Sequence, residues 1–151
     1  MANRNPICDR IFTAPGVVCA TEEETRSLGR ELAGAIAEEA TLSLEGPLGA
    51  GKTCFVQGLA QGLGLDPAMV SSPTFTLIHE YPGGRLPLIH FDLYRLNSER
   101  ELAGLGCEDY FQTPGVRAIE WGDKFPGMLS AGVWRIRFLI ESGCRRIRGV
   151  R

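Results

Sequence analysis

The stretch from Leu44 to Thr53 has the residue types and the spacing that bind a polyphosphate. Its sequence fits the pattern G-x-x-x-x-G-K-[ST]. Glycines let the backbone turn and present N–H groups to phosphate oxygens, and the positive end of the following helix faces the same anion. In this pattern Lys52 reaches the β- and γ-phosphates, and the Thr53 hydroxyl coordinates Mg²⁺. The residues predicted to bind the nucleotide here are Gly46, Pro47, Leu48, Gly49, Ala50, Gly51, Lys52, Thr53 and Cys54.

The segments around this loop have the order that a phosphate site requires. Residues 41–45 are strand-like, and residues 54–63 are predicted to form a helix that ends at Gly64. Of the sixteen basic residues only Lys52 and Lys124 are lysines. A lysine in an arginine-rich chain suits a pocket that needs a compact, flexible point charge. The alternative is a glycine-rich strand–helix turn without a ligand.

The remaining elements alternate between strand and helix. Predicted strands are 17–19, 76–81, 86–92, 116–121 and 134–141, followed by an arginine-rich last strand. Two capping boxes each predict the start of a helix. The helix that starts at Thr21 is predicted to run to about Glu39, and the helix that starts at Ser98 is predicted to stop near residues 104–106. The sequence therefore predicts one domain over residues 1–151. Its fold class is an α/β P-loop NTPase sandwich, with a central mixed, mostly parallel sheet flanked by helices and antiparallel hairpins at the edges.

Acidic residues near the metal are expected at strand ends. Asp92 and Glu120 each end a mostly apolar strand, and either is a candidate to hold Mg²⁺ or to orient the attacking group. The alternatives are a loop acid for Asp92 and a surface acid for Glu120. Thr74 is a candidate γ-phosphate sensor or part of a plain Ser/Thr/Pro turn. Trp121 is a candidate to stack on a nucleotide base, and the alternative is that its indole belongs to the hydrophobic core. A structural role is expected for both histidines.

Composition excludes several other classes. The net charge is −2 and no apolar stretch approaches the ~20 residues of a membrane span, so we expect no membrane attachment and a cytoplasmic protein. The five cysteines are scattered, and none are spaced C-x-x-C, so neither disulfide partners nor a zinc site is expected.

Five segments taken together resemble the TsaE (YjeE-type) family, the bacterial ATPase components of tRNA threonylcarbamoyladenosine synthesis. In order along the chain they are 46–53, 72–77 (Ser-Pro-Thr-Phe-Thr-Leu), 90–96 (His-Phe-Asp-Leu-Tyr-Arg-Leu), 105–111 and 119–121 (Ile-Glu-Trp). The resemblance covers residues 20–148. The phosphate loop is shared by many families, whereas the 90–96 string with a downstream Glu-Trp is specific.

The resemblance implies ATP and Mg²⁺ as cofactors and a role for each matching residue. Lys52 and Thr53 bind phosphates and Mg²⁺, Glu120 helps to hold the metal or its water, and Asp92 is an essential acid nearby. Residues 72–74 belong to a switch-like loop. Two further sites are implied for the base: Trp121 lies against the adenine, and the helix start from Glu22 to Thr25 approaches it from the other side. Two positions depart from the family pattern. Pro47 stands where the family often has an acidic residue, and Gly122 stands where the family often has proline.

The resemblance also implies TsaD and TsaB as partner proteins, which modify adenosine 37 of tRNA, so that tRNA is reached indirectly. A small-molecule P-loop kinase is the alternative, although such kinases usually carry a late arginine-bearing lid. A small GTPase lacks support because no N-K-x-D string occurs. A nucleic-acid module is suggested by the C-terminal arginines, which equally suit a charged edge strand. These arginines are Arg135, Arg137, Arg145, Arg146, Arg148 and Arg151.

Overall fold

The computed structural model describes residues 5–73 and 75–150. The candidate switch residue Thr74 lies outside the described residues. The helices are α1 (Pro6–Phe12), α2 (Glu22–Ala33), α3 (Lys52–Gly62), α4 (Glu99–Ala103) and α5 (Cys107–Gln112), with short 3-10 turns η1 (Pro67–Met69), η2 (Gly122–Lys124) and η3 (Pro126–Met128). The strands are β1 (Val17–Cys19), β2 (Ala40–Glu45), β3 (Ile78–Tyr81), β4 (Leu88–Asp92), β5 (Val116–Glu120), β6 (Trp134–Glu141) and β7 (Cys144–Val150).

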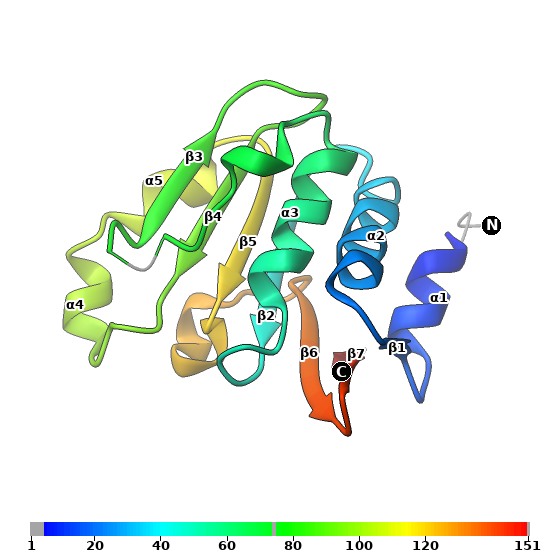
Figure 1. Cartoon of the computed structure of the whole chain (residues 1–151). Helices are drawn as coiled ribbons and strands as arrows, with labels where there is room; N and C mark the ends of the chain where they lie inside the picture. Colours follow the sequence, from blue (N-terminus) through cyan, green and yellow to red (C-terminus); the bar gives the residue numbers. More distant parts are fainter. Residues whose placement is uncertain (1–4, 74, 151) are drawn as a thin grey trace.

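The strands form one seven-stranded sheet in the order β1-β7-β6-β2-β5-β4-β3. The central pairs β6–β2, β2–β5 and β5–β4 are parallel, and the pairs β1–β7, β7–β6 and β4–β3 are antiparallel. Figure 1 shows α2 and α3 side by side over the sheet, with α4 and α5 near β3 and β4. This arrangement confirms the predicted fold class.

Alternation along the strands assigns side chains to two faces of this sheet. Leu88 and Val116 belong to the larger buried cluster, which includes the apolar stripes of α2 and α3. Ile89 and Ile119 belong to a second cluster, which packs against α4 and α5. The acids Asp92 and Glu120 are in phase with Leu88 and Val116, so both point to the α3 face at the carboxyl ends of β4 and β5.

Helices α2 and α3 approach each other closely through glycines. A Cβ atom on Gly58 would lie 2.0 Å from the carbonyl oxygen of Arg26, and one on Gly29 would lie 2.2 Å from that of Phe55. Larger side chains at these positions would collide with backbone, which cannot move aside as a flexible side chain can. The phosphate-loop helix is therefore seated against α2 at main-chain contact distance.

Several predicted boundaries are wrong. Helix α2 ends at Ala33 rather than near Glu39, and Arg85 reaches across to donate hydrogen bonds to the carbonyls of Ala33 (2.8 Å) and Ile36 (2.7 Å). These bonds satisfy carbonyls that a longer helix would pair internally. Strand β3 begins at Ile78 instead of Thr76 because Leu77 adopts a φ of 68°, which is incompatible with a strand.

The C-terminal half of the sheet also differs from expectation. Strand β7 is not an edge strand, because β1 pairs with its outer side. Along β6 the apolar side chains at alternate positions are buried at Ile136 and Phe138, but Ile140 is 50% exposed and Trp134 is only partly buried against the core. Helices α1 and α5 were not predicted. Both are short, and Asn5 caps α1 through its side chain, whereas α5 begins after Gly106 in the left-handed region.

Candidate nucleotide-binding site

The phosphate loop connects β2 to α3, and its glycines adopt backbone angles that other residues rarely reach. Gly46, Gly49 and Gly51 have φ values of 146°, 75° and 96°. A Cβ on Gly46 would also lie 2.5 Å from the carbonyl oxygen of Phe138. Gly51 is the N-cap residue of α3 and supplies no side-chain cap, so the first N–H groups of α3 are open to an anion.

Lys52 lies folded back within this loop. Its Nζ donates to the Gly46 carbonyl and lies 3.6 Å from the centroid of the Trp121 ring. Burial lowers the pKa of the Lys52 ammonium, and the carboxylates of Glu120 and Asp92 act in the opposite direction. The ammonium is thus partly desolvated, and it lies over an aromatic face with carboxylates nearby.

The two predicted metal acids converge on the start of α3. Glu120 accepts a hydrogen bond at Oε1 from the Thr53 hydroxyl (2.9 Å), and the same oxygen lies 2.9 Å from His90 Nε2. Asp92 accepts from the Ser72 hydroxyl (2.8 Å) at Oδ2. Asp92 and Glu120 stand opposite each other in the parallel register of β4 and β5, and each is only 4% exposed. Two buried carboxylates and a hydroxyl therefore meet at one end of the sheet.

These three side chains offer only oxygen donors, which Mg²⁺ prefers. Among residues 5–73 and 75–150 no group of three or more His, Cys, Asp or Glu side chains is placed to hold a metal by itself. A phosphate-bound ion needs no such group, because nucleotide oxygens and water complete its shell. The donor set of Thr53, Glu120 and Asp92 therefore fits Mg²⁺ bound together with a nucleotide.

The extended conformation of β5 ends before Trp121. Glu120 and Trp121 are adjacent in the sequence, so both can face one ligand only if the strand does not continue. Alternation would send Trp121 to the opposite face from Glu120. Its φ of 65° breaks the strand, and the indole lies over Lys52 and against the Tyr94 ring, 5.1 Å away between centroids, while it also packs against the second buried cluster. The positive φ belongs to Trp121 itself and not to Gly122. Gly122 is needed for space instead, because a Cβ there would lie 2.8 Å from Ser43 Oγ.

Two neighbouring cavities open beside the loop. The larger, about 380 Å³, is lined by Glu22, Leu48, Gly49, Gly51, Lys52, Thr53, Cys54, Ser72, Asp92, Tyr94 and Glu120. A smaller one of about 140 Å³ shares Glu22, Gly49, Gly51 and Cys54 with it and adds Thr25 and residues 143–145. A cavity of about 600 Å³ lies elsewhere, between α4, α5 and η3, and contains none of the predicted site residues.

Most of the predicted site residues therefore come together. Gly46, Pro47 and Ala50 line neither cavity but shape the loop. The Gly46 carbonyl accepts from Lys52, and the Ala50 N–H donates to the Pro47 carbonyl (3.3 Å). Trp121 contacts the site through Lys52. Sequence reasoning missed the contact of His90 with Glu120, although His90 lies two residues before Asp92 and so shares its face of β4. It also missed Arg145, which donates to the Gly49 carbonyl (3.1 Å).

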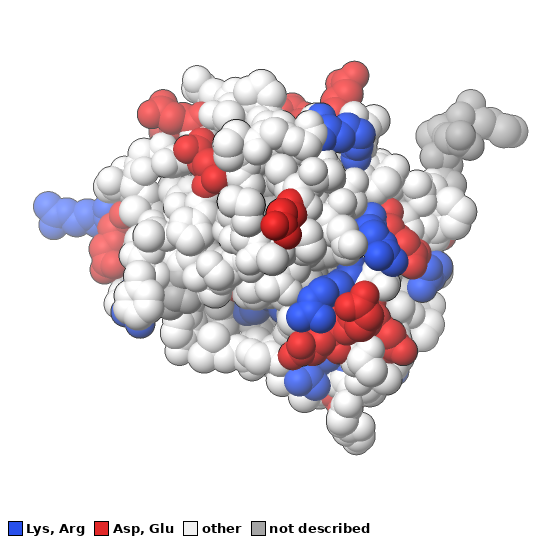
Figure 2. Space-filling view, turned by 45° about the horizontal axis from the view of Figure 1, so that its top comes forward, with Lys and Arg blue, Asp and Glu red and all other residues white. Residues whose placement is uncertain are grey.

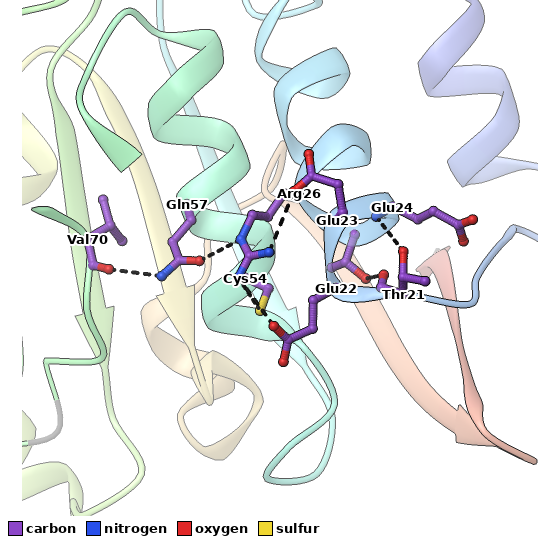
Figure 3. A network of polar contacts seen from close by, with 9 residues as sticks. Thr21, Glu22, Glu23, Glu24, Arg26, Cys54, Gln57 and Val70 are labelled. Atoms are coloured by element: carbon purple, nitrogen blue, oxygen red, sulfur yellow. Dashed lines mark hydrogen bonds and ion pairs between the residues drawn. The ribbon is translucent and has the colours of Figure 1, made fainter. Parts of the chain in front are cut away.

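A polar network joins the cavity wall to the segment before Ser72 (Figure 3). Arg26 on α2 pairs with Glu22 (3.3 Å) and donates through Nε to Gln57 Oε1 (3.0 Å). Gln57 on α3 donates in turn to the carbonyl of Val70 (3.1 Å). The start of α2, the phosphate-loop helix and the chain entering residues 71–73 are thus tied together.

Several charged side chains outside the site are paired with a neighbour of opposite charge. Figure 2 shows acidic and basic side chains interspersed on the face in view. In the C-terminal hairpin, Arg135 and Arg137 pair with the buried Glu45, and Arg146 pairs with Glu141. These pairs favour structural roles for Arg135, Arg137 and Arg146. In the described part of the chain, no helix combines the length and apolar character needed to cross a membrane.

The chain is similar to several known proteins. Residues 19–147 match the family model for threonylcarbamoyl adenosine biosynthesis protein TsaE. The chain is 46% identical to such a protein from Nostoc sp., over 73% of this chain and 69% of the relative, and 48% identical to one from Bacillus subtilis, over 66% and 61%. The crystal structure of Bacillus subtilis YdiB superimposes with a TM-score of 0.69 at 34% identity, covering 87% of this chain and 80% of that one.

Proposed function

This chain belongs to the TsaE family, whose role is in the biosynthesis of threonylcarbamoyladenosine in tRNA, and we propose that it serves that pathway as a Mg²⁺-dependent ATPase. One observation carries the proposal. The Thr53 hydroxyl, at the start of the phosphate-loop helix, bonds the Glu120 carboxylate, which stands beside Asp92 in the adjacent strand. Phosphate binding and metal binding are therefore supported at the same place.

Each residue has a distinct part in the proposed reaction. Lys52 and the N–H groups at the start of α3 bind the β- and γ-phosphates. Bound Mg²⁺ would supply charge neutralisation on the phosphoryl group that is transferred to water. Thr53, Glu120 and Asp92 are the side chains that would hold it or its water ligands. Glu120 and Asp92 are also the candidates to orient the attacking water, and His90 fixes the Glu120 carboxylate.

The proposal includes dependence on the partner proteins TsaD and TsaB in the cytoplasm, with tRNA reached through them. The larger cavity, which holds Thr53 and both acids, is lined by no arginine among the described residues. An arginine supplied to a phosphoryl-transfer site is worth roughly 10³–10⁵ in rate. Slow turnover by the isolated chain is therefore expected. A kinase is less well supported, because the late segment forms the β6–β7 hairpin rather than a lid.

Nucleotide binding and turnover test the proposal. We expect ATP and ADP with Mg²⁺ to bind in preference to GTP, and Lys52→Ala to lose charge-assisted contacts worth about 1.5–3 kcal/mol each. Glu120→Ala and Asp92→Ala should each lower ATP turnover, measured as phosphate release with and without TsaB and TsaD. Equal binding of GTP, full activity in both acid variants, or fast turnover indifferent to the partners would each contradict it. Phosphoryl transfer to a small-molecule acceptor would favour the kinase.

A further inference from the structure

Lys124 is the second of only two lysines in the chain, and the proposed function does not use it. Its ammonium contacts three main-chain carbonyls of one turn, those of Leu93 (3.4 Å), Tyr94 (2.7 Å) and Leu96 (2.6 Å). This turn directly follows Asp92 at the end of β4. Lys124 itself lies at the end of η2, the 3-10 turn that follows Glu120 and Trp121.

The two acid-bearing strand ends are thus joined by several contacts. The Leu93 N–H donates to the Glu120 carbonyl (3.1 Å), and the Tyr94 and Trp121 rings meet. Within the turn, the Tyr94 N–H donates to Asp92 Oδ1 (3.0 Å). Movement of the turn would therefore act on the Asp92 carboxylate through this bond. In addition to these contacts, the three hydrogen bonds from Lys124 hold the carbonyl groups of the turn.

The geometry explains why lysine stands here among fourteen arginines. An ammonium has three donors arranged around one atom, so it can meet three carbonyls that converge on a point. A guanidinium presents its donors in a flat, rigid fork that suits carboxylates and phosphates. Arginine at this position would keep the charge but could not place its donors on all three carbonyls.

We propose that Lys124 is a positioning residue for the metal, which fixes the turn at 93–96 so that Asp92 and Glu120 face one Mg²⁺ ion. The inference rests on the proposed Mg²⁺–ATP function. Residues behind metal ligands typically change metal affinity by roughly 10–100-fold when they are replaced. Lys124 acts one step further away, through the backbone of the turn, so the lower end of that range applies.

The first test measures Mg²⁺ dependence in Lys124→Met and Lys124→Arg. We expect the Mg²⁺ concentration for half-maximal ATP turnover to rise about ten-fold in both. ATP binding in excess EDTA should stay near that of the unmodified protein. Arg85→Met is the matched control, because Arg85 also binds main-chain carbonyls but lies away from the site. It should lower the melting temperature and leave the Mg²⁺ requirement unchanged.

The second test needs neither metal nor nucleotide. In a Trp134→Phe background the tryptophan emission reports Trp121 alone, since the chain has two tryptophans. Lys124→Met and Lys124→Arg should shift this emission as the Tyr94 contact loosens, and Arg85→Met should not. Should Lys124→Met fail to fold, Lys124→Arg makes the same comparison with the charge kept.

The outcomes separate the two proposals. An unmodified protein that binds no Mg²⁺–ATP removes the proposed function and this inference with it. A protein with normal Mg²⁺-dependent turnover whose Lys124 variants keep the same Mg²⁺ requirement overturns the inference alone, as does an unchanged Trp121 emission. Equal changes in Arg85→Met would assign Lys124 a general structural role and likewise overturn it.

Discussion

Replacing Gly58 with alanine would disturb the contact between α2 and α3. The new Cβ would stand 2.0 Å from the Arg26 carbonyl oxygen, whereas ordinary contact begins at 3.4 Å, so the helices must separate by more than 1 Å at this point. Overpacking of this kind costs about 1–3 kcal/mol, and the upper end applies because the obstacle is backbone. Alanine recovers about 1 kcal/mol of helix propensity. The expected net loss is about 2 kcal/mol.

Thermal unfolding and nucleotide titration measure the two consequences. For a chain of this size the loss corresponds to a melting temperature roughly 4–8 °C lower. Because Glu22 on α2 lines the larger cavity, ADP affinity should fall as well. Gly127→Ala is the control, since nothing lies within 4 Å of its added Cβ. If Gly58→Ala were as stable as the parent protein, the close seating of α3 on α2 would be wrong.

Three further outcomes follow from the site and the sheet. Burial lowers the Lys52 pKa in the free protein, and bound phosphate should raise it. Nucleotide binding should therefore take up protons at pH values between the Lys52 pKa of the free protein and the higher pKa of the complex, and it should weaken as the pH rises there. Calorimetry in two buffers of different ionisation enthalpy measures this uptake, and none should be seen with Lys52→Met. Glu45→Gln should lower the free energy of unfolding by about 2 kcal/mol, because both of its arginine partners lose a charged acceptor, whereas Glu141→Gln, at an exposed pair, should change it less. Trp121→Ala should weaken ATP about ten-fold, and ATP should alter the emission of the parent protein and of Trp134→Phe; a signal that survives in Trp121→Phe but not in Trp134→Phe would contradict this.

The parts of the fold that local sequence signals determine were predictable. The Thr21 hydroxyl accepts a hydrogen bond from the Glu24 N–H, and the Ser98 hydroxyl accepts one from the Glu101 N–H. These bonds join residues only three positions apart, so the local sequence is enough to predict them. The end of α2 was not predictable. It depends on Arg85, which is 49 residues from Ile36 and supplies the capping bonds from the β3–β4 hairpin.

The site shows the same division. The phosphate loop and the acids at the ends of β4 and β5 follow from spacing and alternation, so Lys52, Thr53, Asp92 and Glu120 could be placed together in advance. The positive φ of Trp121 could not be predicted, because a residue with a bulky side chain rarely adopts this backbone conformation and the surroundings impose it. Likewise, Lys124 contacts main-chain carbonyls, which every residue has, so the sequence could not indicate these contacts.

The position of β1 has a consequence for synthesis on the ribosome. Val17 pairs with Ile147 and Cys19 with Arg145, so β1 is made 126–130 residues before the strand that it pairs with. Until β7 has left the exit tunnel, β1 stays unpaired while the β2–α3 unit and its phosphate loop can already form. Closure of a loop of this length is slow compared with local contacts. The nascent chain therefore carries an unpaired strand while the intervening residues are made. Unpaired strand edges favour chaperone binding and premature pairing between neighbouring chains.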